Sequence, residues 1–244
     1  MENTTKLLIN HALCHVLLIP AFIYGTWWMF LASFLWWYVI AIVAISGGYH
    51  RYYSHKAFKA GKFYEIMVNV LGIFSGAGPA MTWAGTHVQH HAYSDTDKDP
   101  HSHASKGKWA VYVNTWGYGF KIRRRFITRF MRSKILMWFY KYYFHVNIAI
   151  VVVLTAIDPL LMIFGYALPV VWAFHGYGIL NILGHKNAQP TNSWIANILT
   201  AGEGWHANHH KSAANYRIGK EWWQFDPTAW YIKAFHKVTV KRTT

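Results

Sequence analysis

Two long stretches of the chain, residues 7–50 and 142–185, are apolar and contain no lysine or arginine. Each is 44 residues long, which at ~1.5 Å per residue gives roughly 66 Å of helix, about two crossings of a ~30 Å hydrocarbon core. The pattern therefore predicts two helical hairpins. Their four spans are expected near residues 7–25, 28–47, 139–157 and 160–184. We expect the second hairpin to turn between Asp158-Pro159 and Gly165.

A further apolar run covers residues 63–82 and is interrupted by Gly72, Gly76, Gly78 and Pro79. If this run crossed the membrane, the segments on either side of it would face opposite compartments. Both of those segments carry histidines that we expect to act together. We therefore predict an interfacial or re-entrant helix here.

The distribution of charge gives the predicted spans a direction. The chain has 24 Lys and Arg against 9 Asp and Glu, a net charge of +15, although 54% of its residues are hydrophobic. All the cations lie outside the two windows. Because cytoplasmic loops carry an excess of Lys and Arg, both termini are expected in the cytoplasm, with cytosolic segments at 50–62, 83–135 and 186–244. The charge thus reports membrane topology, and no nucleic-acid partner is expected.

Histidines form the chemical signature of the sequence. There are sixteen of them, and eight stand in three short motifs: His50-x4-His55, His87-x2-His90-His91 and His206-x2-His209-His210. On a helix, positions i, i+3 and i+4 share a face, whereas adjacent residues point about 100° apart, so one adjacent pair can serve two metals. His50 and His55 diverge on a regular helix and are expected to straddle a helix end. Asn181 and His185 are i, i+4 at the end of the fourth span.

Nine histidines are too many for one metal ion and suit two. Neutral imidazole is a good ligand for iron, copper, zinc and nickel. A metal transporter is a rival interpretation, but its ligands should lie within the spans along a path across the membrane. Here eight of the nine lie outside the predicted spans or at their ends. The sequence therefore predicts an all-α integral membrane protein of one domain, residues 1–244, in which a cytosolic helical cap holds a dinuclear metal site.

These motifs, with the flanks Ala92–His101 and Gly202–Trp205, resemble the membrane-bound fatty acid desaturases of the Δ9 type. The resemblance implies a non-haem centre of two irons and a reaction that consumes dioxygen and two external electrons. The products are a cis double bond in a saturated acyl chain and water. It also implies the ligand sets: His50, His55, His91 and His210 with Asn181 through a water on one iron, and His87, His90, His185, His206 and His209 on the other. No catalytic residue beyond these ligands is implied.

Several further residues are assigned weaker roles. Asp95, Asp97 and Asp99 are spaced like calcium ligands, but Pro100 and Lys106 stand where a calcium loop needs Gly and Glu. We expect these carboxylates to orient metal-bound imidazoles through their N–H groups, with Asp97, Asp99 and Glu203 as first choices and loop capping as the alternative. Trp83 and Trp205 are expected to line the acyl tunnel, and core packing is the equal alternative.

The sequence also suggests a substrate and partners. Gly85-Thr86 precedes the second motif, where acyl-CoA desaturases tend to have Arg-Asp, so an acyl-lipid or carrier-protein thioester is favoured over acyl-CoA. No His-Pro-Gly-Gly haem motif is present, so electrons are expected from a separate ferredoxin or cytochrome b5-type protein. Segment 121–134 could dock such an acidic carrier or bind anionic lipid. A related di-iron hydroxylase or alkane monooxygenase remains the alternative enzyme.

Overall fold

The computed structural model describes residues 3–117 and 119–238, which are mostly helical. Four helical stretches are long and apolar enough to cross a membrane, as the sequence predicted: Asn3–Tyr24, Trp27–Ser54, Lys134–Ile157 and Pro159–Leu183. The first comprises α1 (Asn3–Val16) and α2 (Leu18–Tyr24), and the second comprises α3 (Trp27–Ile40) and the π-helix η1 (Ala41–Ser54). The third is α9 (Lys134–Ile157), and the fourth joins α10 (Pro159–Met162), the π-helix η3 (Ile163–Ala167) and α11 (Leu168–Leu183).

The turn between α9 and α10 follows from two residues. Asp158 accepts a hydrogen bond from the Leu160 backbone N–H at 2.8 Å, and Pro159 occupies the first helical position. A capping carboxylate followed by proline is a strong helix-start signal. The turn therefore lies at the first of the two places that the sequence offered.

The apolar run 63–82 is two helices rather than one. Helix α4 (Lys62–Ile73) ends before a glycine turn, and α5 (Ala80–Tyr93) begins after it. Gly76 and Gly78 have φ values of 66° and 82°, a left-handed conformation that glycine adopts readily. The twelve residues of α4 make about 18 Å of helix, which is too short to cross a ~30 Å core.

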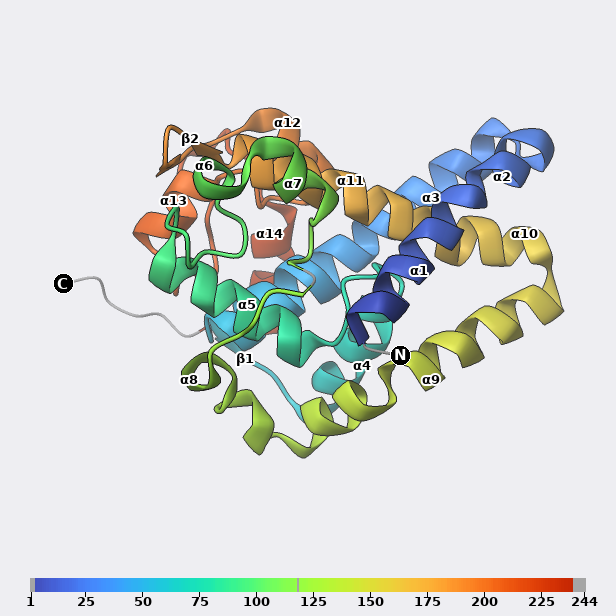
Figure 1. The fold of residues 1–244 in the computed structure, drawn as a ribbon, viewed down its shortest axis with the longest axis horizontal. Coiled ribbons are helices and arrows are strands. Elements are labelled where there is room, and N and C mark those ends of the chain that lie inside the picture. Colours follow the sequence, from blue (N-terminus) through green and yellow to red (C-terminus); the bar gives the residue numbers. More distant parts are fainter. Residues whose placement is uncertain (1–2, 118, 239–244) are drawn as a thin grey trace.

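The remaining elements form a cap at one end of the molecule. In Figure 1 the ends of the four long stretches, at α2, α3, α9 and α10, extend toward one side, whereas α5 and α13 lie with the short helices at the other. The short helices are α6 (His103–Lys106), α7 (Lys108–Val113), α8 (Arg124–Ile127), η2 (Phe130–Arg132), α12 (Trp194–Leu199), α13 (His206–Lys211) and α14 (Pro227–Phe235). Two small antiparallel ladders join β1 (Phe58–Lys59) to β4 (Lys237–Val238) and β2 (His185–Lys186) to β3 (Gln189–Pro190).

Helix η1 carries the second span into the middle of this cap. It packs against α4, α5 and α14, and Ala44, Ile45, Tyr49 and His50 are all buried. The helix therefore ends at Ser54 rather than near residue 47. The first histidine motif consequently lies inside the core of the cap.

Candidate metal centre

Nine histidines converge in the cap and form two neighbouring groups. They are the nine that the sequence singled out, and they come from η1 and its end, α5, β2 and α13. Within each group the ring nitrogens lie within 4.8 Å of one another. The first group is His50, His55, His87, His91 and His209; the second is His90, His185, His206 and His210.

The Nε2 atoms face each other in both groups. In the first group they are separated by 3.0 Å (His50–His209), 2.9 Å (His55–His87), 3.0 Å (His87–His91) and 2.8 Å (His91–His209). In the second group the separations are 3.3 Å (His90–His210), 3.0 Å (His206–His210) and 3.0 Å (His185–His206). Each of the nine rings thus turns its Nε2 atom toward the other histidines of its own group.

This grouping differs from the ligand division that the resemblance implied. The structure pairs His87 with His91 and His206 with His210, so His87 and His209 lie in the group of His50, and His210 lies in the other. Helix geometry allows this result. Residues i and i+4 differ by about 40° around an α-helix, whereas i and i+3 differ by about 60° on the opposite side. Either pair could share a group by angle alone, and in the structure the i, i+4 pairs do so while the adjacent histidines divide.

His50 and His55 meet because their helix is a π-helix. The His55 backbone N–H donates to the His50 carbonyl at 3.2 Å, an i→i+5 bond that places residues five apart above one another. Their rings lie 4.8 Å apart. The expectation that they diverge holds only for a regular α-helix. The prediction that they straddle a helix end agrees with His55 following Ser54 as the cap residue.

Three carboxylates orient the imidazoles from outside. Glu203 lies 2.5 Å from Nδ1 of His50, Asp99 lies 2.8 Å from Nδ1 of His90, and Asp95 lies 2.9 Å from Nδ1 of His185. The hydrogen bonds from His90 and His185 hold the proton on Nδ1 and leave an Nε2 lone pair directed inward, and the charge of Glu203 favours the same tautomer in His50.

The expected partner Asp97 takes no part in this arrangement. Its side chain is exposed, and within residues 3–117 and 119–238 it forms no ion pair with a histidine. Asp95 fills that role instead. The sequence could not show which of the two aspartates faces the histidines. Asp95 has a φ of 64°, and a left-handed residue changes the direction of the side chains that follow.

Glu203 is part of a buried ionic network that the sequence did not reveal. Arg51, 1% exposed, donates to Glu203 at 3.2 Å and lies 2.9 Å from Asp226, and Ser46 also donates to Glu203. Burial alone would raise the pKa of Glu203, but the charges of His50 and Arg51 outweigh it and lower that pKa to about 2. Glu203 therefore stays ionised behind His50.

Seven of the nine histidines have a lowered pKa, which favours the neutral ring. Burial, reinforced by neighbouring histidines, lowers the pKa of His55, His87, His206 and His209 well below the ordinary value. The same causes lower the pKa of His210 to about 2. Neutral imidazole is the form that binds a metal ion.

The four-histidine group cannot satisfy its own hydrogen bonds. The Nε2 contacts run from His90 through His210 and His206 to His185. Both end residues give their Nδ1 proton to a carboxylate, so both present Nε2 as an acceptor. Four atoms that alternate between donor and acceptor cannot have acceptors at both ends. At least one contact must therefore join two lone pairs or two N–H groups, and a cation among the four rings would remove that conflict.

Comparison with known proteins agrees with this geometry. A family model described as fatty acid desaturase matches residues 25–239, which include all nine histidines.

The chain belongs to the fatty acid desaturase family.

Curated relatives cover most of the chain. An acyl-CoA 5-desaturase from Anemone leveillei is 30% identical over 89% of this chain and 72% of its own length. An sn-1 stearoyl-lipid 9-desaturase from Anabaena variabilis is 30% identical over 81% and 76%. An sn-2 palmitoyl-lipid 9-desaturase from a Nostoc species is 31% identical over 83% and 76%. The protein is accordingly an oxidoreductase of lipid metabolism, and its histidine groups and apolar helices fit a metal-binding membrane enzyme.

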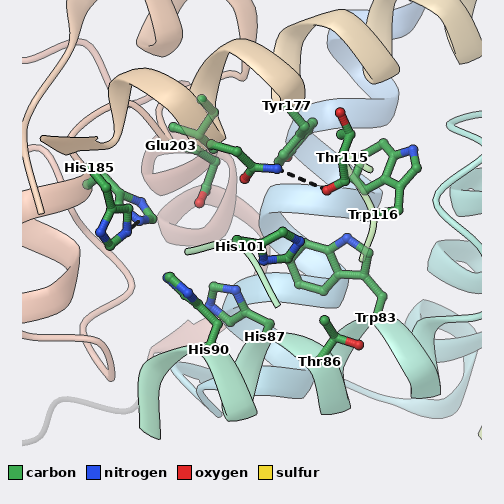
Figure 2. A pocket seen from close by; sticks show the side chains of 13 residues that line it. Trp83, Thr86, His87, His90, His101, Thr115, Trp116, Tyr177, His185 and Glu203 are labelled. Carbon is green, nitrogen blue, oxygen red and sulfur yellow. Dashed lines mark hydrogen bonds between the residues drawn. The ribbon is translucent and has the colours of Figure 1, made fainter. Parts of the chain in front are cut away.

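A cavity of about 50 Å³ adjoins the two histidine groups of the desaturase. Figure 2 shows His87, His90 and His185 on one side and Trp83, Thr115 and Trp116 on the other. Trp83 stacks on His87 with ring centroids 5.1 Å apart. It therefore lines the cavity beside the candidate metal ligands, and its role in an acyl tunnel stays a prediction.

Asn181 also lines this cavity, with three members of the four-histidine group. The resemblance had placed it with His50 instead. Its side-chain amide donates to the Thr115 carbonyl at 2.9 Å, which holds the side chain at the cavity wall.

His101 is a wall residue that sequence reasoning passed over. It lies on the same cavity and forms a cluster with His90 and Asp99. Its only sequence signal was its place in the Asp99-Pro100-His101 flank of the second motif.

Trp205 does not line the cavity within the described residues. Its indole N–H donates to the Phe225 carbonyl at 2.9 Å, and its ring makes edge contacts with Trp194 and Trp223, with centroids 4.8 and 5.7 Å away. It is a buried packing residue, so of the two alternatives for Trp205 the structure supports core packing.

Proposed function

We propose that this desaturase introduces a cis double bond, at Δ9, into a saturated acyl chain of a membrane lipid. The reaction would use two bound irons, dioxygen and two electrons from a separate carrier. The support is twofold: nine histidines converge in two groups that could each hold a metal ion, and two of the relatives above are named acyl-lipid 9-desaturases of cyanobacteria.

The proposed ligands follow the groups in the structure. One iron would take the five histidines of the first group, and the other would take the four of the second, with Asn181 beside it through a water. Bound iron supplies the oxidising chemistry that removes hydrogens from unactivated methylenes. The chain's own part is to hold the rings neutral, to fix their tautomers through Glu203, Asp99 and Asp95, and to exclude bulk water.

A series of adjoining cavities supports an acyl substrate. The cavity at the histidines shares Trp83, Thr86 and Trp116 with a second cavity of about 210 Å³, whose other walls include Leu7, Ala77 and Tyr140. The acyl chain would lie in the second cavity and present one pair of methylenes to the first. The cavity beside the histidines is small enough to hold only a short length of the acyl chain. The indole rings of Trp83 and Trp116 would therefore orient the reacting methylenes.

The outer end of this series suits a polar head group. The second cavity shares Phe120 and Ile122 with an open pocket of about 570 Å³ that is lined by Lys98, Lys121, Arg123 and Arg124. Cationic side chains there would attract a lipid phosphate or another anionic head group. Gly85, where acyl-CoA desaturases tend to have Arg, carries no side chain for a coenzyme A group.

The proposed topology places the cap and both termini in the cytoplasm, because the cations lie outside the two apolar windows. Electrons would come from a ferredoxin or cytochrome b5-type protein. The basic segment 121–134 offers a surface for such an acidic carrier.

The convergence of the nine histidines is the observation that carries the proposal. Expression in a desaturase-deficient host, with mapping of double bonds in total lipids, tests it. We expect new cis-Δ9 chains with the wild-type protein and with Asp97→Asn, and none with His91→Ala. A hydroxylated chain without a new double bond would instead identify a hydroxylase, and metal transport that survives His90→Ala and His210→Ala would identify a transporter.

A further inference from the structure

Two short helices of the cap expose large apolar side chains. On α7, Trp109 and Val113 are 78% and 63% exposed, and on α12, Trp194, Ile195 and Ile198 are 47%, 62% and 53% exposed. We call these five residues the apolar collar. Both helices pack against α11 (Figure 1). A group of exposed Trp and Ile side chains on a cap marks a surface that is covered in the working protein.

Polar contacts fix the height of α12 along the spans. The Trp37 indole N–H of α3 donates to the Leu199 carbonyl at the end of α12, at 3.4 Å. A Cβ atom on Gly176 of α11 would lie 3.0 Å from the same carbonyl oxygen. Gly176 lies seven residues before Leu183, where α11 ends. The end of α12 is therefore about 10 Å below the top of that span.

Helix α7 lies at the same height. The Tyr112 hydroxyl is 2.7 Å from Nδ1 of His175, and the Thr115 hydroxyl is 3.4 Å from the Phe174 carbonyl. Both partners belong to α11 and adjoin Gly176 in sequence. The two collar helices thus flank one short stretch of α11.

The second span leaves its lipid-facing environment at this same level. Val39 of α3 is still exposed, whereas Ile40, Ala41, Ala44 and Ile45 are buried in the cap. Val39 is two residues from Trp37, which contacts α12. A bilayer that surrounds α3 therefore ends where the collar begins.

We propose that α7 and α12 are interfacial helices, with the apolar collar resting in the head-group layer on the histidine side of the bilayer. Tryptophan favours that layer, and a short helix with an exposed apolar face binds there. Lys108, the first residue of α7, is exposed and suits anionic head groups. A bilayer that surrounds α3 also reaches the collar, because the two lie at the same level. A second copy of the chain could cover the collar only by displacing that lipid.

This arrangement places the histidine groups outside the hydrocarbon. It also puts Thr115 and Trp116, which line the metal cavity, two and three residues beyond Val113 of the collar. The inference concerns the depth of the protein in the membrane and goes beyond the proposed reaction, so its test needs no measurement of activity.

Spin labels on single cysteines test the depth of the collar. Cys14, the one natural cysteine, is first replaced by Ala. Labels are then placed at Ile195, Ile198 and Val113, with Val152 on α9 as the lipid-exposed control and Lys220 as the water-exposed control. Each variant is reconstituted in nanodiscs that hold one copy, and power saturation compares collision with oxygen and with a water-soluble nickel chelate.

The collar labels are expected to collide with oxygen more than Lys220 does and to lie shallower than Val152. Collisions with the nickel chelate as frequent as at Lys220 would overturn the inference. So would an oxygen preference that appears only in nanodiscs holding two copies, because the covering surface would then be a second chain. Unchanged circular dichroism in each variant ensures that the labels report the folded protein.

Discussion

At the scale of residues, the candidate ligands could be predicted from the sequence and their division into groups could not. Spacing alone identified nine histidines, because i, i+3 and i+4 positions share a face. It could not choose between i+3 and i+4 partners. That choice depends on how α5 and α13 approach each other, which only the structure supplies. The same limit explains why Asp97 was expected in place of Asp95, whose backbone is left-handed.

The orienting carboxylates give the first prediction. Asp95→Asn, Asp99→Asn and Glu203→Gln each remove the charge that holds an Nδ1 proton in place, so each should lower metal affinity about 10–100-fold. Competition with a chelator measures this affinity without any turnover. Asp97→Asn is the matched control and should bind metal as the wild-type protein does. Equal losses in all four variants would mean that the acidic loop acts only through its total charge.

At the scale of elements, the four apolar spans followed from composition, whereas the π-helix did not. Residues 41–54 have no pattern that distinguishes an i→i+5 helix from an α-helix. The cause lies in tertiary packing, since η1 is enclosed by α4, α5 and α14. The glycine turn before α5 was visible in the sequence, although its effect in dividing residues 63–82 into two helices was not anticipated.

The packing of η1 on α4 gives the second prediction. A Cβ atom on Gly48 would lie 2.8 Å from Cβ of Val68, so Gly48→Ala should force the helices apart and destabilise the fold by about 1–3 kcal/mol. Thermal unfolding in detergent measures the change. Val68→Ala keeps that Cβ but removes Cγ1 and Cγ2, which would lie 2.9 and 3.2 Å away, so the double variant should recover part of the loss relative to the two single changes. Strictly additive losses would show that the two helices do not meet at this point.

At the scale of the whole molecule, the cap is a core around the two histidine groups, built from segments distant in sequence. The sequence indicated its contents, because the cations lie outside the two windows and the histidine motifs lie outside them or at their edge. It did not indicate that η1 and α11 continue into the cap and bring His50 and Asn181 with them. Nor did it reveal the Arg51–Glu203–Asp226 network, since no spacing rule links residues so far apart.

The buried histidines give the third prediction, on pH. Their folded-state pKa values are lowered, to about 2 for His210, whereas in the unfolded chain they titrate near 6.5. Below about pH 6.5 the unfolded state therefore binds more protons, and the stability of the metal-free protein should fall as the solution is acidified. The thermal midpoint between pH 8 and pH 5 measures this. A variant with His206→Gln and His210→Gln should show a flatter profile, and a midpoint that rises on acidification would contradict the account.

Tightly bound iron in paired histidine variants tests the central claim, that the nine histidines form one group of five and one of four. After equilibration with a chelator, the wild-type protein should retain about two irons per chain. His87→Ala/His91→Ala and His206→Ala/His210→Ala each damage one group and should each retain about one. His91→Ala/His210→Ala damages both groups and should retain none. Equal iron in all three double variants, or one iron in the third, would contradict the two groups seen in the structure.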